Sequence, residues 1–178
     1  MNKLLVPLAA AVLAAGCAQL GMQGSSSGGA RASAQLAPTT GNSTRGTVTF
    51  TQMGDRVRVV AQISGLKPNA EHGFHVHEKG DCSSGDGMSA GGHYNPAGKP
   101  HGDHRAGGER HAGDLPNLRA DSYGNASATF DTGGITIGGG NADIIGKGLI
   151  VHRDPDDYKS QPAGNAGPRV ACAVIQKG

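Results

Sequence analysis

The stretch HGFHVHEKGDC, residues 72–82, places three histidines within six positions of a short apolar segment. Its alternation predicts a β-strand, in which side chains two residues apart point to the same face. Phe74 and Val76 would then enter the core of the protein. His75 and His77 would present two imidazoles side by side on the opposite face, which is half of a metal site. The stretch therefore predicts a buried strand with metal ligands on one side.

The composition favours a single β domain. The chain has 178 residues, which is room for one ordinary domain. It contains 31 glycines, three phenylalanines, three tyrosines and no tryptophan, so its core must consist mainly of Val, Ile, Leu and Ala. Much glycine with many short apolar runs favours a loop-rich β protein over a helical bundle.

Short alternating segments separated by turn residues recur along the chain. In DRVRVVAQISGL (55–66) the apolar side chains of one face are Val57, Val59, Ala61 and Ile63. The other segments are GTVTF (46–50), GNASATFD (124–131), GGITI (133–137), DIIGKGLIVH (143–152) and RVACAVI (169–175). About eight strands without a helical segment or a repeat predict an all-β antiparallel sandwich or flattened barrel.

The first 17 residues, MNKLLVPLAAAVLAAGC, have the pattern of a secretory signal. Their apolar run is too short to span the ~30 Å hydrocarbon core of a bilayer. The ending LAAGC resembles a bacterial lipobox, so residues 1–16 are predicted to be a signal peptide and Cys17 a lipidated anchor. Ala14 stands where a lipobox usually has leucine, so a plain signal peptide with an incidental Cys17 stays open. The predicted location is the periplasm or cell envelope, held to a membrane by the lipid.

Residues 17–31 are rich in Gly, Ser, Ala and Gln and predict a flexible tether, which places the folded domain at residues 32–178. The formal charge of the chain is +2, and removal of the signal peptide takes away only Lys3 among its charged side chains. The remaining charge of about +1 gives no indication of a basic nucleic-acid-binding surface.

Two cysteines remain once Cys17 is assigned to the signal boundary. In an exported chain Cys82 and Cys172 form an even pair in an oxidising compartment. A disulfide between them would close a loop of roughly ninety residues, worth about 4 kcal/mol in the chain-entropy model. The alternative is two unrelated buried thiols.

Residues 79–120 have little periodicity and much Gly, Pro, Asp and His. A loop of this length in a compact domain is uncommon unless it is functional. The metal-binding candidates within it are His93, His101, His104, His111 and Asp114. His101, His111 and Asp114 with one further imidazole would make a tetrahedral zinc site, and imidazole also suits copper. A late strand ends at His152, which would return to the histidines of residues 72–82.

Five motifs together resemble copper–zinc superoxide dismutases in their order and spacing. They are GFHVHEKGDC (73–82), GGHYNP (91–96), ERHAGDLPN (109–117), IIGKGLIVH (144–152) and the highly specific GNAGPRVACAVI (164–175). The resemblance covers about residues 32–176. It implies a Greek-key β-sandwich with long metal-binding and active-site loops, copper and zinc as cofactors, and superoxide as the substrate that is converted to dioxygen and hydrogen peroxide.

The resemblance also implies a role for each site residue. The copper ligands would be His75, His77, His93 and His152. The zinc ligands would be His93, His101, His111 and Asp114. One imidazole, that of His93, would therefore bridge both metals.

Further residues match the family around these ligands. Asp156 corresponds to the aspartate that links His75 to His101 through the nitrogens that do not bind metal. A turn-forming role for Asp156, or a match at Asp154 or Asp157 instead, stays open at this point. Arg169 corresponds to the arginine that lies over the copper and attracts superoxide, and with His93 it is the predicted catalytic pair.

The resemblance implies three structural roles as well. Cys82 and Cys172 correspond to the family disulfide. His72 corresponds to a buried, hydrogen-bonded histidine. His104 competes with His101 for the zinc position, and the spacing from His93 favours His101 and leaves His104 a loop residue.

The chain departs from the animal enzymes in two places. Residues 154–167 are several residues shorter and lack their cluster of glutamates, and the C-terminal VIQKG is polar where the animal-type dimer continues apolar. A monomer and a homodimer both stay open. Alternatives to an enzyme are a copper- and zinc-binding buffer or delivery module, a copper-only variant and a zinc hydrolase. Arg169 and the copper histidines disfavour the buffer, and the zinc ligands disfavour the copper-only variant. The zinc hydrolase is disfavoured because no free Glu or Asp beside an open zinc position is apparent.

Overall fold

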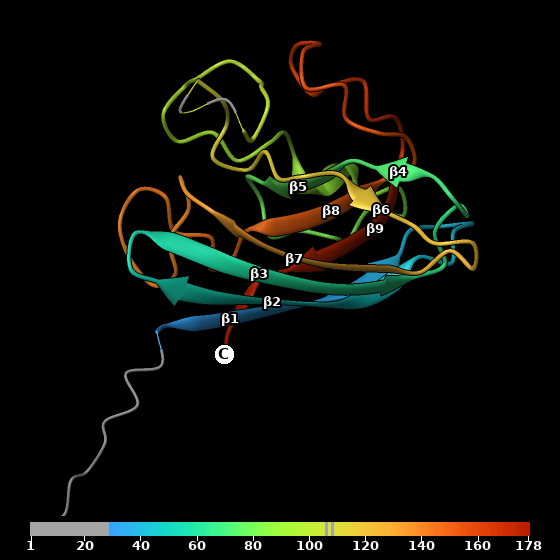
Figure 1. Ribbon diagram of the computed structural model, residues 1–178, viewed down its shortest axis with the longest axis horizontal. Helices are drawn as coiled ribbons and strands as arrows, with labels where there is room; N and C mark the ends of the chain where they lie inside the picture. The colour runs from blue at the N-terminus through green and yellow to red at the C-terminus, as the bar shows by residue number, and fades with distance from the viewer. Residues whose placement is uncertain (1–28, 106, 108) are drawn as a thin grey trace, which may run out of the picture.

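The computed structural model describes residues 29–105, 107 and 109–178 (Figure 1). The predicted signal peptide, the lipidated Cys17 and most of the tether lie outside these residues. The first strand begins at Arg31, one residue before the predicted start of the domain. Among the described residues, no helix is long and apolar enough to cross a membrane.

The regular structure of these residues consists of ten strands and one short 3-10 helix. The elements are β1 (Arg31–Pro38), β2 (Arg45–Met53), β3 (Arg56–Ser64), β4 (Glu71–His72), β5 (Phe74–His77), η1 (Met88–Ala90), β6 (Leu118–Arg119), β7 (Ala126–Thr132), β8 (Gly148–His152), β9 (Arg169–Val174) and β10 (Gln176–Lys177).

Eight of the strands form one antiparallel sheet in the order β5-β8-β9-β1-β2-β3-β7, with β10 beside β1. Strand β1 joins the two halves of this sheet: its residues 31–36 pair with β2, and Ala37 and Pro38 pair with β9. The sheet therefore folds over on itself, with β1, β2, β3 and β7 in one layer and β5, β8 and β9 in the other (Figure 1). This arrangement confirms the predicted antiparallel sandwich.

The core lies between the two layers. The predicted inward face of β3 is buried throughout, from Val57 to Ile63. Phe50 of β2 and Phe74 of β5 are the largest apolar side chains with no exposure. Alternate burial along β2 and β3 follows from the two-residue period of a strand. The second layer is buried on both faces, because loops cover its outer side, and β5 and β8 are buried at every residue.

Two segments differ from the sequence-based expectation. GGITI (133–137) is a loop rather than a strand, with a single bridge from Thr136 to Asp143. Its isoleucines are buried nonetheless, and Gly134 has a φ of 85°, which breaks an extended run. Strand β1 was not expected, because its inward side chains are mostly alanine, whose small volume gives only a weak alternating pattern.

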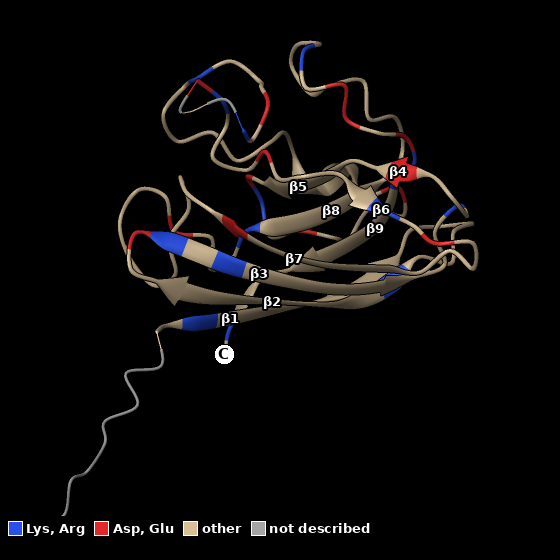
Figure 2. Cartoon of the chain, in the orientation of Figure 1, with Lys and Arg blue, Asp and Glu red and all other residues tan. Residues whose placement is uncertain are grey.

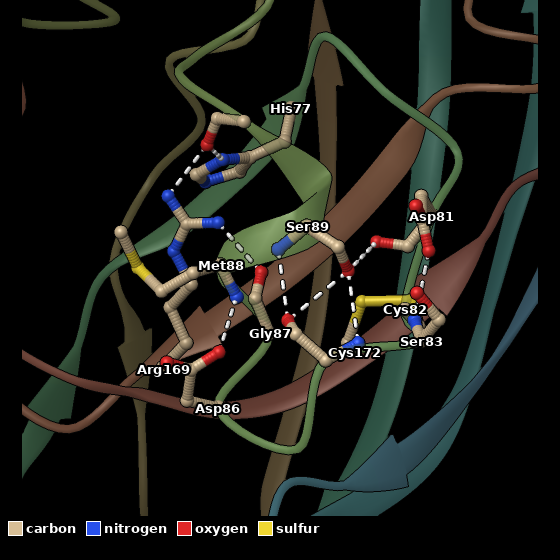
Figure 3. Close-up of a disulfide and its surroundings, with 12 residues drawn as sticks. His77, Asp81, Cys82, Ser83, Asp86, Gly87, Met88, Ser89, Arg169 and Cys172 are labelled. Atoms are coloured by element: carbon tan, nitrogen blue, oxygen red, sulfur yellow. Dashed lines mark hydrogen bonds between the residues drawn. A yellow bond between two sulfur atoms is a disulfide. The ribbon is translucent and has the colours of Figure 1, made fainter.

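Cys82 and Cys172 form a disulfide across 90 positions of the chain, which confirms the predicted pair (Figure 3). The bond fixes the segment after β5 to β9. Cys82 is half-buried, whereas Cys172 is buried with Ala90 and Ile150 in a small apolar cluster of its own. The disulfide thus joins the loop that follows β5 to the layer formed by β5, β8 and β9.

Replacement of Phe50 by alanine should remove about 3–5 kcal/mol from the free energy of unfolding, because the cavity lies in the centre of the core. Guanidinium unfolding of the metal-loaded protein would measure this loss. The control is Met53→Ala in the same strand: Met53 is 45% exposed, and its removal should change stability by less than about 0.5 kcal/mol. Equal losses in the two variants would contradict this description of the core.

Candidate metal centre

The long loop after β5 runs beside that strand and covers its free edge. His77 pairs with His93, and His75 pairs with Asp114, as isolated antiparallel bridges. Between them, Val76 N donates to Gly113 O at 2.9 Å. Because Val76 faces the core, the two histidines of β5 face the loop. The backbone pairing thereby brings loop ligands next to strand ligands.

Two sets of four side chains place possible ligand atoms within 4.8 Å of one another. The four-histidine set is His75, His77, His93 and His152. The mixed set is His93, His101, His111 and Asp114. All members are buried, and His93 belongs to both sets. The structure thus brings together each group that the resemblance implied.

Each imidazole of the four-histidine set uses one ring nitrogen within the protein and leaves the other unpaired. His77 Nδ1 lies 2.9 Å from Gly91 O, and His152 Nδ1 lies 3.0 Å from Gly167 O. The buried ring nitrogens without a hydrogen-bond partner among the described residues include His75 Nδ1, His77 Nε2, His93 Nε2 and His152 Nε2. A buried polar atom without a partner is costly, so four of them within one small space fit a metal with imidazole ligands, such as copper.

The mixed set has the geometry of a small tetrahedral site. Asp114 Oδ1 lies 2.8 Å from His93 Nδ1, 3.1 Å from His101 Nδ1 and 3.2 Å from His111 Nδ1. The Nδ1 atoms of His93 and His111 are 3.4 Å apart. Ligand atoms around a tetrahedral zinc lie about 3.3 Å from one another, given zinc–nitrogen bonds of about 2.0–2.1 Å. Three imidazoles and one carboxylate at these distances fit zinc.

The carboxylate of Asp156 contacts one imidazole of each set. Its Oδ2 lies 2.7 Å from His75 Nε2, and its Oδ1 lies 2.9 Å from His101 Nε2. These contacts leave the Nδ1 atom of each ring for metal, as the resemblance implied. They distinguish Asp156 from its neighbours Asp154, which pairs with Arg153, and Asp157, which is exposed. Gly164 makes room for this carboxylate, because a Cβ there would lie 1.8 Å from Asp156 Oδ1.

The pKa values follow from burial and from the two carboxylates. Burial lowers the pKa of His93 to about 4 and that of His152 to about 3, which keeps both rings neutral at pH 7. Burial also disfavours charge on His101, but the carboxylates of Asp114 and Asp156 outweigh it and raise the pKa of His101 to about 9. Neutral imidazole is the form that binds metal, so the four-histidine set is prepared for a metal ion.

Arg169 lies beside the four-histidine set at the start of β9. Its guanidinium donates to Gly87 O at 2.7 Å and also to Gly91 O. Gly91 O accepts from His77 Nδ1 as well, so one carbonyl holds both side chains. Figure 3 shows Arg169 pointing toward His77 over the segment that the disulfide fixes.

Two amide side chains that the sequence reasoning missed hold the site from outside. Gln161 accepts from His101 N and donates to His101 O, both at 2.9 Å. Asn117 binds the N–H and the carbonyl of Asp156 in the same way, both at 3.0 Å. Gln161 thereby fixes the main chain of His101, a member of the mixed set, and Asn117 fixes the main chain of Asp156. Neither amide has a sequence signal, because its partner is a distant backbone.

The two remaining histidines lie outside both sets. His72 is buried, and its Nδ1 lies 2.9 Å from His152 O, which confirms the predicted hydrogen-bonded structural role. His104 is half-buried in the loop, with its ring 5.4 Å from that of Tyr158. His101 therefore occupies the place in the mixed set for which His104 was the competitor.

The model of the copper/zinc superoxide dismutase (SODC) family matches residues 44–175. The chain belongs to this family. Its members are oxidoreductases that act on superoxide with copper and zinc, so the predicted enzyme class, substrate and cofactors are confirmed.

Relatives from distant sources share this superoxide dismutase domain. Cu-Zn superoxide dismutase 2 of Aquifex aeolicus (strain VF5) is 44% identical over 124 residues, which are 67% of this chain and 72% of that protein. The Cu-Zn superoxide dismutase of Schizosaccharomyces pombe (strain 972 / ATCC 24843) is 44% identical over 138 residues, 73% of this chain and 88% of that protein.

Solved structures agree with the fold of this superoxide dismutase. A superoxide dismutase-like protein from Bacillus subtilis has a TM-score of 0.72 at 33% identity, covering 80% of this chain and 96% of that chain. The clock protein EA4 has a TM-score of 0.74 at 42% identity, covering 82% of this chain and 93% of that chain.

Asp156→Asn should weaken the retention of both metals by about 10–100-fold, because an amide accepts only at its oxygen and leaves one imidazole N–H unpaired. Competition against a chelator, followed separately for copper and zinc, would measure the change. Asp154→Asn is the control, since the half-buried Asp154 pairs with Arg153 and belongs to neither ligand set. Unchanged affinity for both metals in Asp156→Asn would refute the linking role of this carboxylate.

Proposed function

We propose that this chain dismutates superoxide at a copper held by the four-histidine set, next to a zinc held by the mixed set. The observation that carries this assignment is the shared ring of His93. Its Nδ1 lies 2.8 Å from Asp114 Oδ1 in the mixed set, and its Nε2, which belongs to the four-histidine set, has no hydrogen-bond partner in the part of the chain that the structure describes. A metal buffer or a zinc hydrolase has no need of one imidazole between two metals.

The metals and the protein side chains have different roles in the reaction. Copper held by His75, His77, His93 and His152 would supply one-electron redox chemistry, by which one superoxide would be oxidised to dioxygen and a second, with two protons, would be reduced to hydrogen peroxide. His93 Nε2 holds a proton for the half of the cycle that forms peroxide, while Nδ1 of the same ring stays in the mixed set. Asp156 keeps the rings of His75 and His101 oriented throughout.

A cavity of about 530 Å³ gives access to this site. Its lining includes His77, His93, His152 and Arg169, together with Pro162 and Ala163 of the loop before β9. Because two backbone carbonyls hold the guanidinium of Arg169, its charge stays in one position at the wall of the cavity. A fixed positive charge in a narrow cavity attracts the superoxide anion and raises its rate of encounter.

Arg169→Ala should lower kcat/KM for superoxide by about tenfold at low ionic strength, because the attracting charge is lost from the cavity. Pulse radiolysis of the copper- and zinc-loaded protein at rising salt would measure the rate. The parent rate should fall as salt screens the charge, and the variant should depend less on salt.

Arg119→Ala is the matched control, because Arg119 lies exposed on β6 and lines no part of this cavity. Its rate should remain at the parent level. Tight binding of both metals by the parent protein without dismutation above that of free copper would refute the enzymatic proposal and favour a metal buffer.

The same enzyme is proposed to act in the cell envelope, where it removes superoxide outside the cytoplasm. The support is the sequence of residues 1–17, which combines a signal-like apolar run with a terminal cysteine, and the disulfide between Cys82 and Cys172, which is typical of an oxidising compartment. Mass spectrometry of the mature N-terminus after expression of the full chain in a bacterium tests the location. A lipid-modified Cys17 in the membrane fraction supports it, and an unmodified N-terminus in the soluble fraction refutes the anchor.

A further inference from the structure

A second cavity adjoins the mixed set at His111. Its volume is about 960 Å³, and residues of the long loop, of β3 and β7, and of the segment after β7 line it. The apolar part of its lining consists of Pro96, Ala97, Ala112, Pro116, Phe130 and Ala142. Among the described residues, His111 alone lines both this cavity and the cavity of about 530 Å³ beside the four-histidine set. A concave, largely apolar space of this size is typical of a small-molecule site.

Positive charge gathers around this cavity. Its lining contains four cationic side chains and one carboxylate, namely Arg56, Lys99, Arg105, Arg110 and Asp131. Figure 2 shows basic residues at the start of β3 and acidic and basic residues together on the long loop. Asp131 is paired with Arg58 at 2.8 Å, and Lys99 and Arg105 are each paired with a loop carboxylate. Among the described residues, Arg56 and Arg110 have no carboxylate within 4.0 Å.

The two arginines without an acidic partner are held in different ways. Arg56, which is exposed on β3, donates one hydrogen bond, to Asp131 O at 2.6 Å, and keeps the rest of its fork for another acceptor. Arg110 is half-buried and donates to four acceptors at the carbonyls of His111, Asp114 and Gly133 and the hydroxyl of Thr132. The positive charge of Arg110 therefore stays fixed at the inner wall, with no carboxylate of the described residues in direct contact with it.

We propose that this cavity binds an organic anion that has one negatively charged group and a flat apolar body. The charged group lies against the free fork of Arg56 in the field of Arg110, and the body packs on Phe130 and Pro96. Guanidinium groups bind carboxylate, sulfonate or phosphate oxygens through paired N–H donors, and they stay charged while half-buried. A neutral compound of the same shape gains no charge-assisted hydrogen bond from the two arginines.

The anion also strengthens the mixed set, because Arg110 lies between the two sites. Its Nη1 holds the carbonyls of His111 and Asp114, at 2.9 and 3.0 Å, and thereby fixes the turn that carries two zinc ligands. A negative charge beside Arg110 stabilises the guanidinium in this position. Because coupling between two binding sites is reciprocal, zinc should be bound more tightly when the anion is bound. Tighter binding with an unchanged rate of zinc entry means slower zinc release. This part of the inference rests on the zinc assignment proposed above.

Calorimetric titration of the copper- and zinc-loaded protein with naphthalene-2-sulfonate tests the site. We expect saturable binding of one molecule per chain, and at least tenfold weaker binding of methanesulfonate, which has the charge alone, and of 2-naphthalenemethanol, which has the ring alone. Equal binding of the ring alcohol, or no saturable binding of the sulfonate, would overturn the proposal.

Two variants locate the site. Arg56→Gln removes an exposed side chain and should weaken sulfonate binding at least fivefold, whereas Arg45→Gln, an equally exposed charge at the start of β2, should leave it unchanged. Equal effects of the two variants would assign the binding to general surface charge and overturn the site. Dismutation should stay at the parent rate in Arg56→Gln, so failure of this proposal leaves the enzymatic one standing.

The rate of zinc release to a coloured chelator tests the coupling. Saturating naphthalene-2-sulfonate should slow the release at least twofold in the parent protein, and Arg56→Gln should need at least five times the sulfonate concentration for the same effect. An unchanged or faster release in the parent protein, at a sulfonate concentration that fills the site, would overturn the coupling through Arg110.

Discussion

Both ring nitrogens of His93 are needed as metal ligands, one in each set, and the rest of the site depends on this constraint. One nitrogen belongs to the mixed set and the other to the four-histidine set, so the ring can stand in only one place and orientation. That place lies beside β5, and the bridges His77–His93 and His75–Asp114 hold the loop there. A long segment without a periodic pattern thus becomes an ordered cover on the free edge of a strand, which would otherwise expose unpaired backbone groups.

The same constraint explains why two carboxylates are buried among so many imidazoles. Asp114 and Asp156 have no exposed side-chain surface, and burial alone would favour their neutral form. Contacts to His75, His93 and His101 reverse this preference and hold the pKa of each carboxyl well below its usual range. A buried charge is tolerable only where its partners are complete. The loop should therefore gain much of its order from metal binding, which completes the coordination of atoms that the protein leaves unpaired.

The sequence was sufficient for the parts of this arrangement that repeat or stand in motifs. Alternation revealed β2, β3 and the core face of β5, and the motif order indicated both ligand sets and the disulfide. Residues whose role depends on one distant backbone contact gave no signal. Gln161 meets the main chain of His101, and Asn117 meets that of Asp156, across 60 and 39 positions. The expected strand at 133–137 failed for the opposite reason, because buried isoleucines share the alternation of a strand without its pairing.

The main effect of the disulfide is to fix the position of the Arg169 guanidinium. Cys172 lies three residues after Arg169 on β9, and Cys82 opens the segment whose carbonyls, at Gly87 and Gly91, receive the guanidinium. This segment contains little regular structure, only the 3-10 helix η1 (Figure 3). Hydrogen bonds alone would therefore leave it free to open locally. The covalent link to β9 holds donor and acceptors together as one unit. Loss of the disulfide would therefore loosen Arg169 and lower the encounter rate before it unfolded the sandwich, whose two layers are joined independently through β1.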